Sequence, residues 1–344
     1  MTPSAQPPSP VLFFDTMNAY QRTAALKGAI ELDLFTAIAE GAATAAALAR
    51  RCKASERGTR ILCDYLTVIG FLTKQEGRYG LMPDSAMFLD RRSPAYLGTA
   101  TRFLASPTSY EAFGNVAETV RKGTTILSGE GMTEPEHPQW VEFARGMAPL
   151  MHMPAEGIAH ILRETEATAK EAVGEWKVLD IAAGHGMFGI TLAQHNPKAE
   201  ITALDWRNVL EVAKENAQAA GVAARYKTIA GSAFEAELGT GYDVVLLTNI
   251  LHHFDVATCE ALLRRVHAAL APGGRAAILE FVPNDDRVSP PQAATFSMMM
   301  LGMTPAGDAY TFGELESMCK NAGFPGAQLH PLEGHPEAVV VATK

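Results

Sequence analysis

Two acidic residues, Asp180 and Asp205, each end an apolar run and enclose a turn of small residues, AAGHG at 182–186. Small residues let the backbone approach a ligand closely, and a carboxylate after the second strand can accept both hydroxyls of a ribose. The stretch therefore predicts a βαβ unit that binds a nucleotide. Because Gly184, Gly186 and Gly189 match the pattern GxGxxG, an NAD-dependent dehydrogenase has to be considered.

The charge and position of this unit bear on which nucleotide it binds. A carboxylate at the end of the first strand, Asp180, would repel a pyrophosphate, but it can meet the ammonium group of an amino acid. The unit also lies past the middle of the chain, behind a long helical region. Both features oppose a dinucleotide, but this stretch alone leaves the identity of the nucleotide open.

Apolar runs alternate with helical patterns from residue 176 onward. The runs include KVLDIA, EITALD, YDVVLLTN and AAILEF, and AVVVATK is expected to add a closing strand. Strands that are apolar throughout are typical of a parallel sheet buried on both faces. The predicted fold class is α/β, with a Rossmann-like doubly wound sheet.

The N-terminal region predicts a helical module with a short hairpin. Residues 11–39 have apolar positions at helical spacing that is interrupted near Gly28, which indicates two helices. Thr44 and Ser55 are N-cap residues for two further helices, and Glu76-Gly77 is typical of a tight turn. This order of elements is the pattern of a winged helix.

A winged helix can bind DNA or pair two subunits, and charge bears on the choice. Residues 50–60 are locally basic, but the chain as a whole carries a formal charge of −9. A nucleic acid or an anionic membrane surface requires a net basic face. We therefore expect a homodimerisation platform and no nucleic-acid partner, with a DNA-binding regulator as the alternative.

The spacing of the cysteines and the hydropathy of the chain indicate whether the protein binds a metal and in which cellular compartment it works. The four cysteines, at 52, 63, 259 and 319, form no CxxC pair, so neither a disulfide framework nor a zinc site is expected. The N-terminal segment has no basic start typical of a signal peptide, and no run reaches the roughly 18 apolar residues of a membrane span. The sequence predicts a cytoplasmic protein without a metal or a membrane partner.

Five motifs follow one another in the second half of the chain. They are DIAAGHG at 180–186, LDW at 204–206, AGSAF at 230–234, LLTNILHHF at 246–254 and LAPGGRAAILEF at 270–281. In this order and spacing the sequence resembles the class I S-adenosylmethionine-dependent methyltransferases. More closely, it resembles the small-molecule O-methyltransferases that include caffeic acid, acetylserotonin and antibiotic-tailoring enzymes.

The resemblance covers nearly the whole chain and implies its domain organisation. Residues 1–105 correspond to an N-terminal winged-helix dimerisation domain. Residues 106–344 correspond to the catalytic domain, in which 106–165 form a helical linker that contributes to the acceptor pocket. The implied partners are a small-molecule acceptor and a second copy of the chain.

The resemblance also implies a site for S-adenosylmethionine around the small-residue turn. The family's turn is DxGGGxG, and two of its glycines fall on Ala182 and Ala183, which a loop tolerates only where φ is negative, as we expect here. The family's acidic residue near the adenine falls on Ser232, which weakens one hydrogen bond. The implied cofactor contacts are Asp180, Ala182, Gly184, Asp205, Trp206, Ser232, Ala233, Phe234 and Thr248.

In the same way, the resemblance implies a base for the acceptor hydroxyl. His252 occupies the family's base position, and an aryl hydroxyl with a pKa of about 10 needs such a proton acceptor. Glu280 occupies the position of the glutamate that orients the imidazole. The second carboxylate falls on Ala309, so either Asp308 substitutes or one carboxylate suffices. His253 is a substitute or accessory group, and a purely structural histidine is the alternative for this pair.

The expected acceptor pocket is rich in sulfur and aromatic side chains. Such walls favour a flat hydrophobic or aromatic molecule. The implied contacts are Trp140, Met147, Met151, Phe254, Phe296, Met299, Met300 and Thr304. The predicted function is O-methylation of a small aromatic or polyketide-like molecule, and N-, S- or C-methylation or a non-methylating use of the same cofactor is the alternative.

Overall fold

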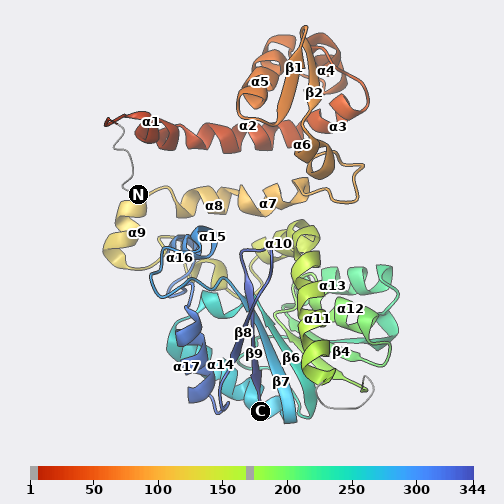
Figure 1. Cartoon of the computed structure of the whole chain (residues 1–344), viewed down its shortest axis with the longest axis vertical. Coiled ribbons are helices and arrows are strands. Elements are labelled where there is room, and N and C mark those ends of the chain that lie inside the picture. Colours follow the sequence, from red (N-terminus) through yellow and green to blue (C-terminus); the bar gives the residue numbers. More distant parts are fainter. Residues whose placement is uncertain (1–6, 168–173) are drawn as a thin grey trace. The chain divides into compact units, whose positions relative to one another are not determined.

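The computed structural model describes residues 7–167 and 174–344. The contacts within the chain divide it into two units, Met1–Thr101 and Arg102–Lys344 (Figure 1). This division lies close to the boundary expected at residue 105.

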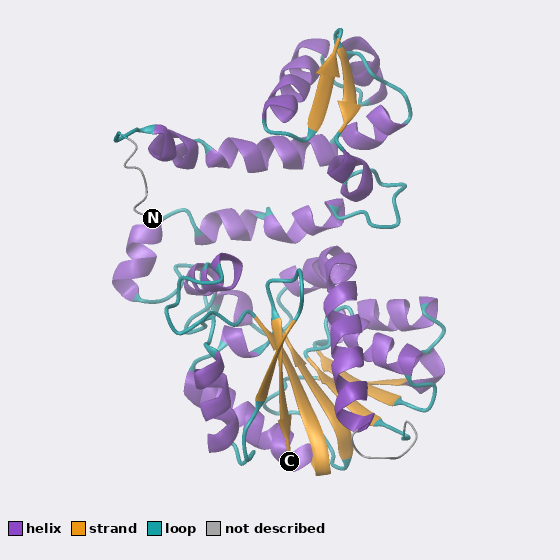
Figure 2. Cartoon of the chain, viewed as in Figure 1, coloured by secondary structure: helices purple, strands orange, loops and turns teal. Residues whose placement is uncertain are grey.

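The first unit is helical and carries one antiparallel hairpin (Figure 2). Its elements are α1 (Val11–Met17), α2 (Ala19–Glu31), α3 (Leu34–Ala39), α4 (Ala45–Arg51), α5 (Glu56–Val68), β1 (Leu72–Gln75), β2 (Arg78–Leu81), α6 (Pro83–Phe88) and η1 (Gly98–Ala100). The Thr44 and Ser55 side chains accept the N–H groups of Ala47 and Gly58, and so cap α4 and α5 as predicted. The helices and the hairpin form the expected winged-helix arrangement.

The helix break predicted at Gly28 is wrong. Helix α2 continues through Gly28 to Glu31, and α1 is separated from α2 at Asn18. The chain instead turns at Asp33, whose φ is 56°. Aspartate tolerates this left-handed conformation better than most residues, so the turn carries no glycine signal in the sequence.

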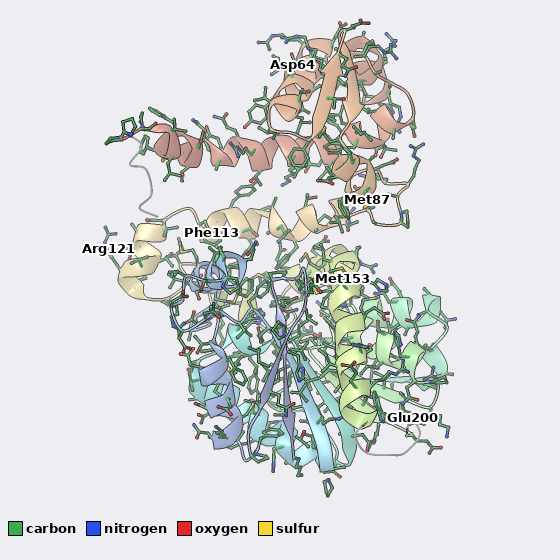
Figure 3. The ribbon with its side chains drawn as sticks, viewed as in Figure 1. Asp64, Met87, Phe113, Arg121, Met153 and Glu200 are labelled. Atoms are coloured by element: carbon green, nitrogen blue, oxygen red, sulfur yellow. The ribbon has the colours of Figure 1, made fainter. Side chains whose placement is uncertain are left out.

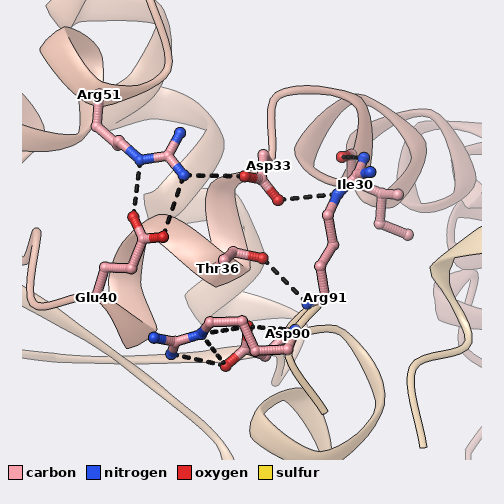
Figure 4. A network of polar contacts seen from close by, with 8 residues as sticks. Ile30, Asp33, Thr36, Glu40, Arg51, Asp90 and Arg91 are labelled. Atoms are coloured by element: carbon pink, nitrogen blue, oxygen red, sulfur yellow. Dashed lines mark hydrogen bonds and ion pairs between the residues drawn. The ribbon is translucent and has the colours of Figure 1, made fainter. Parts of the chain in front are cut away.

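A network of charged side chains joins separate segments of the first unit (Figure 4). Arg51 on α4 contacts Glu40 at 2.8 Å and Asp33 at 3.0 Å. Arg91 binds the other oxygen of Asp33 at 2.9 Å. These pairs are partly exposed, so solvent screens them and each contributes little to stability. Arg51, one of the basic residues considered for DNA binding, is thus paired with two carboxylates.

The second unit is a seven-stranded sheet with helices on both faces, as predicted (Figures 1 and 2). The segment that leads into the sheet contains α7 (Thr101–Leu104), α8 (Pro107–Ala112), α9 (Val116–Lys122), η2 (Gly131–Thr133), α10 (Gln139–Met147), η3 (Ala148–Met151) and α11 (His152–Ala167). The sheet region contains β3 (Lys177–Ile181), α12 (Met187–His195), β4 (Glu200–Asp205), α13 (Arg207–Ala219), η4 (Ala223–Arg225), β5 (Tyr226–Ala230), β6 (Tyr242–Thr248), η5 (Leu251–His253), α14 (Val256–Ala269), β7 (Leu270–Glu280), α15 (Pro291–Ala294), α16 (Phe296–Met303), α17 (Phe312–Asn321), β8 (Gln328–Pro331) and β9 (Ala338–Thr343).

The strand order is β5-β4-β3-β6-β7-β9-β8. Strands β3 to β7 run parallel, whereas β9 is antiparallel to β7, and β8 is antiparallel to β9. The start of β9 therefore lies at the same edge of the sheet as the ends of the parallel strands. The edge strand β8 was not predicted, because it is short, mostly exposed and ends in a proline.

The two faces of the sheet contribute to two separate cores, because successive side chains along a strand point in opposite directions. Val178, Val244 and Val339 pack on the face covered by α11, α12 and α13. Leu179 and Val340 pack on the face covered by α14 and α17. In Figure 3 the side chains fill the space between the sheet and these helices. Ligands of such sheets bind at the carboxyl ends of the strands.

Candidate functional site

The turn after β3 differs from our expectation in one backbone angle. Ala182 has a φ of +55°, so the negative φ predicted at this position is wrong. Ala183 is not among the described residues with a positive φ. The turn must reverse direction within a few residues, and Gly184 and Gly186 also have positive φ angles. Ala182 therefore adopts a left-handed conformation at a steric cost that glycine would avoid.

The later glycines of this turn are required by packing of α12 on the sheet. A Cβ atom on Gly189 would lie 2.9 Å from an Asp180 oxygen and 2.7 Å from Ile201. A Cβ atom on Gly186 would lie 2.5 Å from the Tyr226 hydroxyl. Two of the three glycines in the GxGxxG pattern are thus explained by close packing, so the pattern alone does not identify the ligand.

Asp180 lies behind the turn. Its side chain is fully buried and accepts the Gly189 N–H at 3.1 Å, and burial raises its pKa to about 7. The carboxyl therefore holds the first turn of α12 in this conformation. The direct contact of Asp180 with an ammonium group stays a prediction.

Asp205 ties the two loops of the βαβ unit together. One carboxylate oxygen accepts the Gly184 N–H at 2.7 Å, and the other accepts the Trp206 N–H at 2.6 Å. Burial raises the pKa of Asp205 to about 6, although both hydrogen bonds oppose this shift. The residue is only half-buried, and each oxygen keeps a lone pair for a further donor.

The loop after β5 brings together the other residues predicted near an adenine. Gly231 donates its N–H to the Asp205 carbonyl at 3.0 Å, and the Ser232 hydroxyl accepts the Phe234 N–H at 3.2 Å. The Phe234 ring packs edge-on against Phe254, with ring centroids 5.0 Å apart. Three further predicted residues lie deeper or to one side: Ala233 and Thr248 are buried, and Trp206 packs beside α10 and α13.

His252 and Glu280 are brought together by β6 and β7. Both are buried, and His252 Nδ1 lies 2.5 Å from Glu280 Oε2. The other carboxylate oxygen of Glu280 accepts the N–H groups of Leu251 and His252, at 2.8 and 3.3 Å. One carboxylate thus fixes both the imidazole ring and the backbone turn that carries it.

Burial sets the protonation of this pair. It lowers the pKa of His252 to about 3 and raises the pKa of Glu280 to about 7. The imidazole is therefore neutral at neutral pH. Because Glu280 engages Nδ1, Nε2 is the ring nitrogen left to accept a proton.

His253 packs between aromatic groups. Its ring centroid lies 4.3 Å from the His252 ring and 5.2 Å from Trp140, and its Nδ1 lies 3.3 Å from the Ile250 carbonyl. Burial, and secondly the neighbouring His252, lower its pKa to about 3. The ring therefore stays neutral, and its contacts suit a packing or accessory role.

The family's second carboxylate falls on an alanine in this chain. This residue, Ala309, is fully buried and offers no polar group to His252. Asp308 lies 3.3 Å from Arg287 and accepts the Ala309 N–H at 2.8 Å. The Asp308 carboxylate is therefore engaged elsewhere, and the structure does not support it as a substitute partner for His252.

Two stacked phenylalanines cover one side of His252. Phe296 lies edge-on to the imidazole, with centroids 4.8 Å apart, and stacks on Phe281 at 3.8 Å with an interplanar angle of 13°. Phe296 was predicted at the site, but Phe281 was missed. Its place directly after Glu280, at the end of a buried strand, is the signal that could have found it.

Several predicted acceptor contacts belong to the core in this structure. Met151 and Met300 are buried, and Met147 packs against the core beneath α11. The buried Thr304 hydroxyl donates to the Met300 carbonyl and accepts the Gly307 N–H, so it ends α16. By contrast, Met299 and Trp140 are only partly buried and pack around one apolar cluster.

The described residues were also searched for metal ligands and membrane spans. Within 7–167 and 174–344, no group of three or more His, Cys, Asp or Glu side chains could hold a metal ion. In the same ranges, no helix is long and apolar enough to cross a membrane.

The doubly wound sheet and the small-residue turn closed by Asp205 define a class I methyltransferase fold. A family model of the O-methyltransferase domain matches residues 155–325, and a model of the O-methyltransferase dimerisation domain matches residues 14–91. The chain therefore belongs to the O-methyltransferase family.

Individual relatives agree with this assignment. A 3-hydroxy-5-methyl-1-naphthoate 3-O-methyltransferase of Streptomyces sahachiroi is 30% identical over 91% of this chain and 89% of its own length. The crystal structure of an O-methyltransferase candidate from Nostoc punctiforme is 56% identical, with a TM-score of 0.93 over 98% of this chain and 100% of that chain. Human N-acetylserotonin methyltransferase, solved with S-adenosylmethionine, shares the fold, with a TM-score of 0.84 at 22% identity over 99% of both chains.

Proposed function

We propose that the protein transfers a methyl group from S-adenosylmethionine to a hydroxyl of a small aromatic or polyketide-like molecule, with His252 as the general base. The buried His252–Glu280 pair, 2.5 Å apart at the carboxyl edge of the sheet, carries this proposal. Such a pair provides a neutral imidazole of fixed tautomer, which is what abstraction of a hydroxyl proton requires.

The residues around the small-residue turn fit the cofactor. Asp205 has lone pairs for ribose hydroxyls, and the loop at Ser232 and Phe234 is bonded to Asp205 through Gly231. When bound, S-adenosylmethionine supplies an electrophilic methyl group on a sulfonium. Two solved structures with the same fold contain S-adenosylmethionine or S-adenosylhomocysteine, which favours this cofactor over NAD.

The His252 and Glu280 side chains would share the work on the acceptor. Nε2 of His252 accepts the hydroxyl proton, and the Glu280 carboxylate stabilises the imidazolium that results. General-base catalysis of this kind contributes a factor of about 10² to 10⁴. Glu280 also accepts two backbone N–H groups of the same turn, so the ring needs little reorganisation during the reaction.

The side chains near His252 support a planar acceptor. Phe296 and Phe281 stack beside the imidazole, and Trp140 lies against His253. Aromatic rings of this kind pack well against a flat apolar molecule. Two relatives, the naphthoate enzyme and an acetylserotonin O-methyltransferase, are also named for aromatic substrates.

The test uses the purified chain, S-adenosylmethionine and two probe acceptors, 3-hydroxy-5-methyl-1-naphthoate and N-acetylserotonin. We expect S-adenosylhomocysteine and an O-methylated product of at least one probe, detected by mass spectrometry. His252→Ala should lower turnover by a factor of about 10² to 10⁴ but keep S-adenosylhomocysteine affinity within a few-fold by calorimetry. The matched control, His160→Ala, removes an exposed histidine of α11. Unchanged turnover in His252→Ala would refute the base.

We further propose that the chain forms a homodimer through its first unit. Every residue of α1 is exposed in the single chain, including Leu12, Phe13 and Phe14. Burying such large apolar side chains against a second copy would be strongly favourable. The match of residues 14–91 to a dimerisation domain supports this interface.

Light scattering after size exclusion tests the dimer. Phe13→Asp combined with Phe14→Asp should shift the protein from dimer to monomer, because two charges would be desolvated in the interface. The control Val288→Asp changes another exposed apolar residue, in the second unit. A wild-type monomer, or a dimer that the double variant leaves intact, would contradict the proposal.

We also propose a cytoplasmic enzyme without a nucleic-acid partner. Support comes from the four free cysteines, three of them buried, and from the formal charge of −9. Duplex DNA added at low salt should leave the mobility of the protein unchanged.

A further inference from the structure

The segment between α16 and α17 lies against the turn that carries His252, which we name the histidine turn (residues 251–254). A Cβ atom on Gly307, in this segment, would collide with the His252 carbonyl and would lie 3.0 Å from the His253 carbonyl carbon. Gly307 therefore brings its backbone into close contact with the histidine turn. A larger residue could not take this place unless one of the two segments moved.

The segment that contains Gly307 is itself fixed at both ends. The Thr304 side chain is buried, and its hydroxyl accepts the Gly307 N–H at 3.0 Å and donates to the Met300 carbonyl at 2.8 Å. At the other end, the Thr311 hydroxyl accepts a backbone N–H from the first turn of α17. The segment is thus anchored to α16 on one side and to α17 on the other.

Tyr310 makes a second contact from this segment to the histidine turn. Its side chain is buried, and its hydroxyl donates to the Phe254 carbonyl at 2.5 Å. The Phe254 N–H donates to the Leu251 carbonyl at 3.1 Å and so closes the turn. The Cys259 thiol also donates to the Leu251 carbonyl, at 3.1 Å. The Tyr310 hydroxyl thus holds the residue at which the histidine turn ends.

The histidine turn is therefore held at its start and at its end by different groups. At its start, Glu280 accepts the N–H groups of Leu251 and His252. At its end, Tyr310 donates to the Phe254 carbonyl. A phenylalanine would fill the Tyr310 position without burying a hydroxyl, so packing alone gives no reason for a tyrosine here.

We propose that Tyr310 is a positioning residue for the methyl transfer: its hydroxyl fixes the Phe254 carbonyl and thereby sets the His252 ring against Glu280. This role rests on the proposed function of His252 as the base. Tyr310 itself touches neither the acceptor nor the cofactor in this account. A displacement of about 1 Å in a reacting group can cost a factor of about 10² in rate, so one hydrogen bond at this place is important for turnover.

Two tyrosine variants test this role. Tyr310→Phe removes the hydroxyl and keeps the ring. The matched control, Tyr242→Phe, removes another buried hydroxyl that donates to a backbone carbonyl, that of Leu238 at 2.7 Å, at the amino-terminal end of β6. Both variants should lower Tm by a similar amount, because each loses one buried hydrogen bond. Only Tyr310→Phe should lower kcat with the methylated probe acceptor, by about tenfold.

The effect of Tyr310→Phe should depend on His252. In the His252→Ala background, Tyr310→Phe should change the residual rate by less than about twofold, because the ring that it positions is gone. Affinity for S-adenosylhomocysteine should stay within about threefold in both tyrosine variants. A further tenfold fall in the double variant, or a comparable loss of cofactor affinity in Tyr310→Phe, would place the role of Tyr310 elsewhere and overturn the proposal.

A second readout does not depend on the acceptor. In protein with ¹⁵N-labelled histidine, the proton between His252 Nδ1 and Glu280 should give a far-downfield resonance that His252→Ala abolishes. Tyr310→Phe should shift or broaden this resonance, because the turn that carries the ring is released at its end. Tyr242→Phe should leave the resonance unchanged.

The close contact at Gly307 provides an independent way to disturb the same turn. Gly307→Ala should displace the His252 carbonyl, so it should lower kcat at least as much as Tyr310→Phe and shift the same resonance. The control Gly313→Ala lies in the first turn of α17, where an added Cβ atom would meet nothing within 4 Å, and it should change neither readout. If Tyr310→Phe does not fold, this pair of variants tests the proposal.

The outcomes for the positioning role differ from those for the proposed function. If Tyr310→Phe lowers kcat no more than Tyr242→Phe and leaves the Nδ1 resonance unchanged, Tyr310 only stabilises the fold and the inference is wrong. If no probe is methylated but Tyr310→Phe and Gly307→Ala alone move the resonance, the positioning of the ring stands and the function of His252 as the base fails.

Discussion

Two histidine–carboxyl pairs lie at the carboxyl edge of the sheet, and they differ in how their acids are satisfied. Glu280 contacts His252 at 2.5 Å and accepts two backbone N–H groups. Glu337 lies 3.2 Å from His335 and has no hydrogen bond of ordinary geometry among the described residues. The first pair is built to hold one ring in one tautomer, and the second is not.

Burial alone does not distinguish the two pairs. It raises the pKa of both acids, to about 7 for Glu280 and about 8 for Glu337. A raised carboxyl pKa therefore indicates a buried acid, whereas the number and direction of its hydrogen bonds indicate what it orients. The comparison therefore supports the proposed proton abstraction at the His252 pair, whose acid and ring are both fixed, and gives no such support to the Glu337 pair.

The largest expected difference between the pairs comes from removing each histidine. His252→Ala should lower kcat by a factor of about 10² to 10⁴, because the proton acceptor is lost. His335→Ala should lower it less than about threefold, since His335 contacts no reacting group in this account. Steady-state methyl transfer to the same probe measures both. Equal losses of kcat in His252→Ala and His335→Ala would contradict the different roles of the two histidines.

Removing the charge of Glu280 should have the next largest effect. Glu280→Gln keeps the shape of the side chain but loses the stabilisation of the imidazolium, so kcat should fall about 10- to 100-fold. Single-turnover rates measure the chemical step directly. The control Glu314→Gln alters a partly exposed carboxylate that pairs with Arg287, and its rate should match wild type.

The pH dependence of the rate should reflect Glu280. Below a pH of about 7 its carboxyl is protonated and donates to Nδ1, which places the imidazole proton on Nε2 and removes the base. Deprotonation leaves one proton on Nδ1 and frees Nε2. The rate of transfer should therefore rise with pH up to about 7 and then level off, and Glu280→Gln should remove the rise. A rise that persists in the variant would point to another titrating group.

The titration of Glu337 should instead affect how the stability of the protein depends on pH. Its pKa is raised from 4.5 to about 8 on folding, so the folded state holds more protons between these values. Stability is then lost as pH increases across that window, by at most about 1.4 kcal/mol per pH unit. Glu337→Leu removes this dependence, so its Tm advantage over wild type should be larger at pH 8 than at pH 5. A constant difference between the two melting curves would contradict the shift.

The smallest expected effect concerns the turn at the cofactor site. Ala182 has a positive φ, so Ala182→Gly relieves steric strain but adds unfolded-state entropy, and the net gain should be below about 1 kcal/mol. Ala183→Gly gains no such relief and should lose about 0.5 to 1 kcal/mol. Urea unfolding measures both. A loss in Ala182→Gly equal to that in Ala183→Gly would show that the strain is absent.

Features with short-range signals were predictable from the chain. The apolar runs predicted as strands are the buried strands β3, β4, β6, β7 and β9 of the structure. The polar caps Thr44 and Ser55 began helices where expected. The order of the motifs, through the family they resemble, also paired His252 with Glu280. Each of these depends on a local periodicity, a local hydrogen bond or a recognisable motif.

Other features required the folded chain, because they depend on groups far apart in sequence. The φ of Ala182 is set by a turn that must close on Asp205, and Asp308 is bound by Arg287. The stack of Phe281 on Phe296 arises only when a strand end meets a helix. Glu337 lies next to the residue that pairs with Glu280 only because the antiparallel β9 begins where β7 ends. Sequence patterns thus identify the strands and the reactive pair, whereas three-dimensional packing decides which further side chains surround them.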